Sequence, residues 1–200
     1  MSRDASEPRG PGRRPAGQDT RGAVLRAARE EFAEKGVDGA SMRSIARRAG
    51  VDPGTVRHWF ANREELVAAS VIPRELNPAE QIRILSAPGL TGLGRRIAET
   101  VLGAWDEEGG PARFRILVAG LSSTDMHDVL APILERSVIP TVSDLVPDPD
   151  PRRFVLVLNL LGGTLLMRHV FRIEPTASLP LEVLVATVGD AIQRALEDPL

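Results

Sequence analysis

Apolar residues recur along the chain at the three- and four-residue spacing of helices, in segments that Gly and Pro interrupt. The first segment runs from Thr20 to about Lys35, carries Leu25 and Phe32 on one face, and stops at Gly36. Further helices are predicted at 42–49, 53–60, 63–72, 78–86, 92–107, 111–121, 126–136, 137–145, 152–173 and 180–197. The pattern predicts an all-α protein.

Two of these helices are short and lie close together. Ser41 is a good N-cap for the helix 42–49, and Pro53 fits the first turn of the helix 53–60. A tight turn that begins at Gly50 joins them. Two short helices with such a turn form a helix-turn-helix, whose second helix enters the major groove of DNA.

The second helix of this motif carries chemistry suited to DNA. Pro53, Gly54 and Thr55 remove bulk at its leading end, where backbone must lie against sugar and phosphate. Arg57 and His58 follow in positions from which they reach base edges or phosphates. The fork of an arginine matches either O6 and N7 of guanine or a phosphate, and the residue pattern leaves both roles open for Arg57.

Residues 20–72 resemble the DNA-binding domain of the TetR family of bacterial repressors. The resemblance rests on TRGAVLRAAREEFAEKG, SMRSIARRAGVDPGTVRHWF and NREEL, which follow the family pattern in order and spacing. It implies an N-terminal three-helix helix-turn-helix domain and a C-terminal helical domain for ligand binding and dimerisation. The residues that it implies at the DNA are Thr20, Arg21, Arg43, Pro53, Gly54, Thr55, Arg57, His58, Trp59 and Arg63.

Three of these positions have alternative readings. The family commonly has Tyr where Arg57 stands and Lys where Arg63 stands. Trp59 either touches DNA or packs inward. The neighbouring Arg47 and Arg48 are interpreted as ordinary surface charge.

The distribution of charge also separates residues 20–72, which carry the family resemblance, from the rest of the chain. Residues 1–19, read as a disordered basic arm, hold four Arg and three acidic residues. The predicted DNA-binding domain, 20–72, holds nine Lys or Arg and seven acidic residues, whereas 73–200 holds 12 Arg and 17 acidic residues. The net charges of +1, +2 and −5 suit a protein that contacts a polyanion at one end.

The C-terminal part is expected to bind a small, largely apolar effector. The candidate ligand contacts are Trp105, Phe114, Met126, Asn159, Met167 and Phe171. Asn159, Thr164, Arg168 and His169 are polar residues that either orient a ligand or satisfy one another at an interface. We expect no catalytic residues, metal or cofactor, because the chain has no cysteine and shows no acid–base cluster or phosphate-binding loop.

The segment 152–173 is apolar almost all round, which predicts a homodimer through the two last helices. Gly162 and Gly163 are expected to allow close approach between helices. The longest apolar run, Phe154–Met167, has 14 residues, too few to span a bilayer, and no secretory signal is visible. We therefore expect a cytoplasmic protein without a membrane partner.

The hypothesis is a homodimeric repressor that binds a near-palindromic operator in double-stranded DNA and is released by its ligand. Two alternatives remain open: a regulator controlled by a protein partner, and a helical enzyme with a vestigial helix-turn-helix. Activation instead of repression also remains open, because the DNA-binding domain does not set the sign of the response.

Overall fold

The structure, a computed structural model, describes residues 20–73, 89–133 and 150–198, together with Leu76, Glu135, Ile139 and Ser143. The helices in these ranges are α1 (Thr20–Gly39), α2 (Met42–Ala49), α3 (Pro53–Trp59), α4 (Arg63–Val71), α6 (Leu93–Asp106), α7 (Gly110–Ala119), α8 (Thr124–Ile133), α10 (Pro151–Leu165), the π-helical segment η3 (Leu166–Phe171) and α11 (Leu181–Glu197). No strand occurs within the described ranges, so the all-α prediction is confirmed there.

Most helix boundaries agree with the sequence pattern within two residues. Gly36 has φ 75° and ψ 167°, which interrupts α1 where the sequence predicts its end. The predicted helix 152–173 is an α-helix that continues into a π-helical segment and ends at Arg172, which has a left-handed backbone. The predicted helices 78–86 and 137–145 lie outside the described residues.

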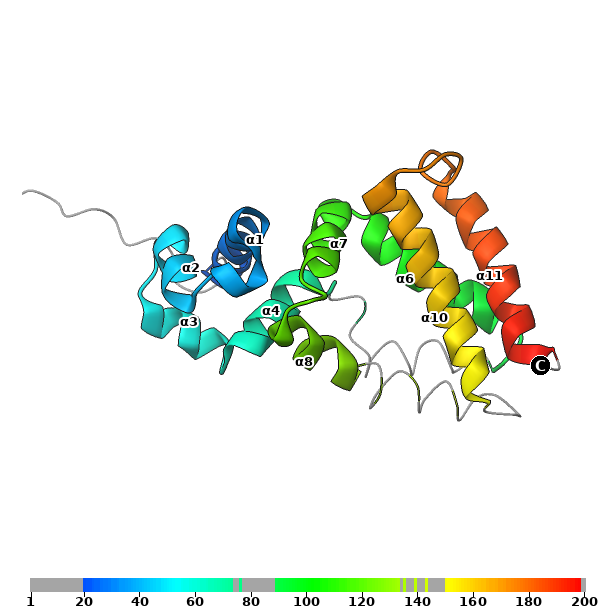
Figure 1. Cartoon of the computed structure of the whole chain (residues 1–200), viewed down its shortest axis with the longest axis horizontal. Helices are drawn as coiled ribbons and strands as arrows, with labels where there is room; N and C mark the ends of the chain where they lie inside the picture. The colour runs from blue at the N-terminus through cyan, green and yellow to red at the C-terminus, as the bar shows by residue number, and fades with distance from the viewer. Residues whose placement is uncertain are drawn as a thin grey trace, which may run out of the picture.

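The helices form two groups at opposite ends of an elongated molecule, with α7 and α8 between them (Figure 1). The first hydrophobic core lies among α1–α4 and includes Phe32, Ile45, Phe60 and Leu66. The second core lies among α6, α10, η3 and α11. Its fully buried members include Leu102 and Ile192.

Helix α7 contributes to both cores. Ile116 belongs to the first core and Phe114 to the second, and Leu117 packs against both. Met126 and Val129 of α8 also complete the first core, beneath α4. The helices of residues 20–72 therefore bury their apolar faces partly against residues of the C-terminal part.

The tightest approach between helices brings α11 against α6. A Cβ atom on Gly94 would lie 2.4 Å from the backbone N of Gln193 and 2.4 Å from the backbone O of Gly189. A Cβ atom on Gly189 would lie 2.7 Å from Cα of Arg95. Only hydrogen at these positions allows the two backbones to come so close.

The expectation that Gly162 and Gly163 bring helices together does not hold within this chain. Among the residues that the structure describes, a Cβ atom at either position would meet nothing within 4 Å. Both glycines lie on the face of α10 that also exposes Val155 and Leu158. The buried residues of α10 lie on its opposite face and include Phe154 and Leu161.

The helical run that contains α10 is longer than the 14-residue apolar segment in the sequence. It covers Pro151–Phe171, which is 21 residues, and its best 18-residue window has a mean hydropathy of 1.7. By length and composition alone this helix is able to cross a membrane, and 28% of that window is buried in the protein. Val155, Leu156 and Leu158 form its exposed apolar face.

The close contact of α6 with α11 makes Gly94 a sensitive position. We expect Gly94→Ala to lower the free energy of unfolding by about 2–3 kcal/mol, because the added methyl group would overlap backbone atoms that do not shift alone. Gly103→Ala on the same helix is the matched control, since its Cβ would meet no described residue within 4 Å. It should be neutral or stabilise the protein by up to about 1 kcal/mol in urea denaturation. Equal effects of the two substitutions would contradict this account of the packing.

Candidate nucleic-acid interface

Short-range hydrogen bonds define the two helices of the helix-turn-helix. Ser41 and Ser44 form a capping box at the start of α2, with each side chain accepting a backbone N–H at 3.0 Å. Gly50 ends α2 with φ 69°, the left-handed conformation that glycine adopts without strain. Asp52 begins α3 by accepting the N–H of Gly54 at 2.7 Å.

Two buried side chains hold α3 against the rest of the bundle. Val56 and Phe60 are fully buried in the first core. The guanidinium of Arg21, at the start of α1, lies over the ring of Phe60 at 5.3 Å from its centroid. Arg21 is thereby placed beside the end of α3, which is consistent with its predicted position at the DNA.

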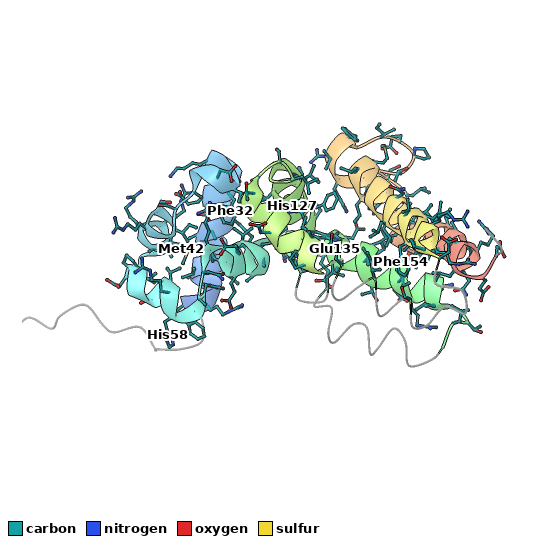
Figure 2. The ribbon with its side chains drawn as sticks, turned by 60° about the horizontal axis from the view of Figure 1, so that its bottom comes forward. Phe32, Met42, His58, His127, Glu135 and Phe154 are labelled. Carbon is teal, nitrogen blue, oxygen red and sulfur yellow. The ribbon has the colours of Figure 1, made fainter. Side chains whose placement is uncertain are left out.

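The face of α3 opposite Val56 is exposed. Its residues are Pro53, Gly54, Arg57 and His58. His58 projects from the outer side of α3, away from the C-terminal helices (Figure 2). Pro53 and Gly54 come first on this face, and Arg57 and His58 follow. A helix that enters a DNA groove leads with its N-terminus, where small residues let the backbone come close.

Trp59 does not pack into the core, because 37% of it is exposed. Its ring meets the edge of His58 at a centroid distance of 5.5 Å and an angle of 74°. Arg43 is exposed on the first turn of α2, while Thr20 and Thr55 are half-buried. The DNA contacts of these residues stay predictions.

Arg63 has a structural role in addition to its predicted place at a phosphate. Its guanidinium donates hydrogen bonds to the backbone carbonyls of Val37 and Ala40. These carbonyls follow the interruption of α1 at Gly36 and lead into α2. Arg63 therefore joins the first residue of α4 to the segment between α1 and α2.

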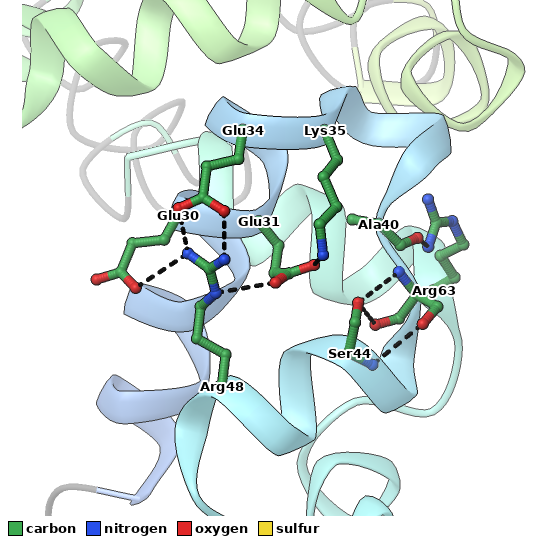
Figure 3. A network of polar contacts seen from close by, with 9 residues as sticks. Glu30, Glu31, Glu34, Lys35, Ala40, Ser44, Arg48 and Arg63 are labelled. Carbon is green, nitrogen blue, oxygen red and sulfur yellow. Dashed lines mark hydrogen bonds and ion pairs between the residues drawn. The ribbon is translucent and has the colours of Figure 1, made fainter.

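The interpretation of Arg48 as ordinary surface charge is wrong. The guanidinium of Arg48 on α2 lies among three carboxylates of α1 (Figure 3). Its Nε is 2.9 Å from Oε1 of Glu31, and its Nη1 donates to Oε1 of Glu34 at 2.6 Å and lies 3.6 Å from Oε2 of Glu30. Arg47 beside it is exposed, so the two arginines have different roles.

Glu31 is the buried member of this network, with a side chain only 3% exposed. Lys35 donates to it at 2.7 Å and, more than any other group, holds the pKa of Glu31 at about 2, with Ser44 and Arg48 also lowering it. Because this pKa lies below its ordinary value of 4.5, the interaction stabilises the fold above pH 4.5 and is lost as the pH falls toward 2. The network therefore ties α2 to α1 at neutral pH.

The six residues predicted to contact a ligand do not form one cluster. Trp105 and Phe114 are buried together, with ring centroids 5.1 Å apart. Met126 is fully buried in the first core, near Val37. The remaining three lie on α10 and η3, where Met167 is half-buried, Asn159 is exposed and Phe171 is 59% exposed.

An ion pair that the sequence did not indicate lies next to the two aromatic rings. Arg168 binds Asp106 through two hydrogen bonds of 2.7 Å, and it also donates to the carbonyl of Leu179 at 2.9 Å. His169 is buried beside Phe114, its Nε2 is 3.4 Å from Oδ1 of Asp106, and burial lowers its pKa. Arg168 is therefore satisfied by Asp106 and by backbone carbonyls, and not by the other polar residues that the sequence grouped with it.

The Arg48 network generates a stability prediction. Arg48→Met should lower the midpoint of thermal unfolding by roughly 2–6 °C, because Glu31 and Glu34 lose their cationic partner on α2. Arg47→Met is the matched control on the same helix and should change the midpoint by less than about 1 °C. If both variants unfold at the same temperature in a calorimetric scan, the network does not stabilise α2.

Comparison with known proteins covers both halves of the chain. Residues 24–70 match the family model described as "Bacterial regulatory proteins, tetR family", and residues 91–196 match "Tetracyclin repressor-like, C-terminal domain". The transcriptional regulator UidR of Escherichia coli K12 is 42% identical over 55 residues, which is 28% of this chain and 28% of that protein. The regulator PksA of Bacillus subtilis is 49% identical over 35 residues, which is 18% of this chain and 17% of that protein.

Solved structures resemble the whole chain. A TetR-family regulator of Streptomyces coelicolor A3 has a TM-score of 0.63 and 29% identity, over 94% of this chain and 100% of that one. The multidrug-binding protein EbrR, solved with malachite green, has a TM-score of 0.61 and 20% identity, over 90% of this chain and 98% of that one, so it shows the fold alone. The C-terminal model covers more than half of the sequence and the N-terminal model covers the helix-turn-helix. The chain therefore belongs to the TetR family of transcriptional regulators.

Proposed function

We propose that this protein is a homodimeric, cytoplasmic repressor that binds a near-palindromic DNA operator and is released by a small, largely apolar ligand. Members of its family bind DNA and small molecules and act as dimers. The observation that carries the proposal is the exposed face of α3, where Arg57 and His58 follow Pro53 and Gly54. Two such helices, 34–36 Å apart, would enter successive major grooves.

The other predicted contacts surround this face. Arg21 lies at the end of α3 through its contact with Phe60, and Arg43 is exposed on α2. In the proposed complex these side chains bind phosphates and set the register, whereas Arg57 binds either a guanine or a phosphate. An operator with a changed half-site distinguishes the two roles of Arg57, because only a base contact depends on sequence.

The dimer is proposed to form through α10 and α11. The exposed face of α10 presents Val155 and Leu156, which are 56% and 42% exposed, and the open surfaces of Gly162 and Gly163. An apolar face of this kind is covered by another surface in a soluble protein. A second copy of α10 would fit closely there, since the glycines leave room for an approaching backbone. This face then explains the high hydropathy of Pro151–Phe171 without a membrane.

The effector is proposed to act on the C-terminal helices near Trp105 and Phe114. A similar fold holds malachite green in EbrR, which supports a ligand role for this domain. A ligand that prefers a conformer with wrongly spaced recognition helices lowers operator affinity through a population shift. A coupling of about 1–3 kcal/mol would weaken operator binding roughly 5–150-fold.

Operator binding tests the DNA-reading proposal directly. Purified protein should bind DNA from immediately upstream of its own gene with nanomolar affinity, and affinity should fall steeply between 50 and 200 mM salt. Arg57→Ala should weaken binding by about 5–150-fold at fixed salt, while Arg95→Gln on the exposed side of α6 should leave it unchanged. Unchanged affinity of Arg57→Ala would remove α3 from the proposed interface.

Sedimentation tests the dimer. Wild-type protein at micromolar concentration should have the mass of two chains, and Val155→Asp should sediment as a monomer because it buries a charge in the proposed interface. Leu121→Asp is the matched control, since Leu121 is an equally apolar residue, 52% exposed, in the turn between α7 and α8. A dimer of Val155→Asp as stable as that of wild type would place the interface elsewhere.

A further inference from the structure

An open groove of about 300 Å³ runs between α1 and α7, where the DNA-binding helices meet the C-terminal part. Its lining residues are Phe32, Ala33, Ala112, Arg115, Ile116 and Ala119. Arg115 is the charged residue among them, and the others are apolar. The groove therefore offers an apolar wall with a cation beside it.

Two further arginines lie at this seam. Arg29 precedes Ala33 by one turn of α1, and Arg113 lies next to Ala112 on α7. They are close enough that Arg113 lowers the pKa of Arg29, although burial of Arg29 lowers it more. The α1–α7 seam is defined as the groove together with Arg29 and Arg113; Arg115 lines the groove, and Arg29 and Arg113 flank its lining residues along α1 and α7.

None of these three arginines is paired with a carboxylate in the part of the chain that the structure describes. Arg29 donates its Nε proton to the carbonyl of Leu25 at 3.1 Å, and Arg115 reaches the carbonyl of His169 at 3.5 Å. Nε of Arg113 is buried and has no hydrogen-bond partner. A buried donor without an acceptor, beside a like charge, destabilises a fold unless a ligand supplies the missing acceptor.

A partner that matches both the arginines and the apolar wall is anionic at one end and apolar at the other. A carboxylate would accept hydrogen bonds from the fork of Arg113 and would offset the repulsion between Arg113 and Arg29. An aliphatic chain would fill the groove beside Phe32 and Ile116 and exclude water from it. The volume is at the small end of ligand sites, which suits an acid with a short chain.

We propose that the α1–α7 seam is a binding site for an amphipathic carboxylate, with its head group on Arg113 and Arg29 and its chain in the groove. This site is separate from the aromatic pair Trp105 and Phe114, which is buried on the other side of α7 in the second core. A ligand in the seam would part α1 from α7, and α7 packs in both cores. Its effect on operator binding rests on the proposed function, whereas the binding itself does not.

Calorimetric titration with sodium octanoate tests the site without DNA. Wild-type protein should bind one octanoate per chain and unfold at a higher temperature with it, and octanol at the same concentration should do neither. Arg113→Gln should bind octanoate at least tenfold more weakly, since it removes the charged fork. Arg95→Gln, a surface arginine outside the seam, should bind it as wild type does.

Two more readouts separate a binding site from a structural arginine. Without ligand, Arg113→Gln should be at least as stable as wild type, because a charge without a partner is removed. Ala119→Leu should also weaken octanoate binding, since it fills the groove and leaves every arginine in place. The proposal is overturned if wild-type protein does not bind octanoate, or if Arg113→Gln and Ala119→Leu bind it as tightly as wild type does. If ligand-free wild-type protein binds octanoate but does not bind its operator, the proposed function is contradicted and the site is not.

Discussion

The packing of α7 in two hydrophobic cores is the constraint on which the rest of the structure depends. Ile116 closes the core of the DNA-binding helices, Phe114 lies in the C-terminal core, and Leu117 touches both. Because packed cores resist continuous deformation, a change on one side of α7 must be accommodated on the other. The helix-turn-helix and the C-terminal core are therefore connected mechanically through α7.

The DNA-binding end depends on its neighbours in the same way. Helices of seven and eight residues, such as α3 and α2, do not form alone in water. Caps at Ser41 and Asp52 define where they begin, but Val56, Phe60 and the ion pairs of Arg48 hold them against α1. The position of the exposed face of α3 therefore depends on the core and the ion network beneath it.

The two glycine pairs show how the C-terminal helices are divided between internal and external packing. Gly94 and Gly189 bring α6 and α11 together inside the chain, whereas Gly162 and Gly163 leave an open apolar face on α10. The amphipathic stripe of α11 is likewise used inside the chain, through residues such as Leu184 and Ile192. Val155, Leu156 and Leu158 of α10 therefore stay exposed, with Val183 the exposed large apolar residue of α11.

The sequence by itself determined the helix-turn-helix, its caps and most helix boundaries, because these depend on residues within four positions of each other. The sequence also placed Arg57 and His58 on the outer face of a short helix. Only the tertiary structure decided that Arg48 is held by α1, that Met126 belongs to the first core, and that α7 joins the two ends. Such pairings join segments far apart along the chain, and no local pattern records which helix faces which; that choice is made when the apolar faces are buried together.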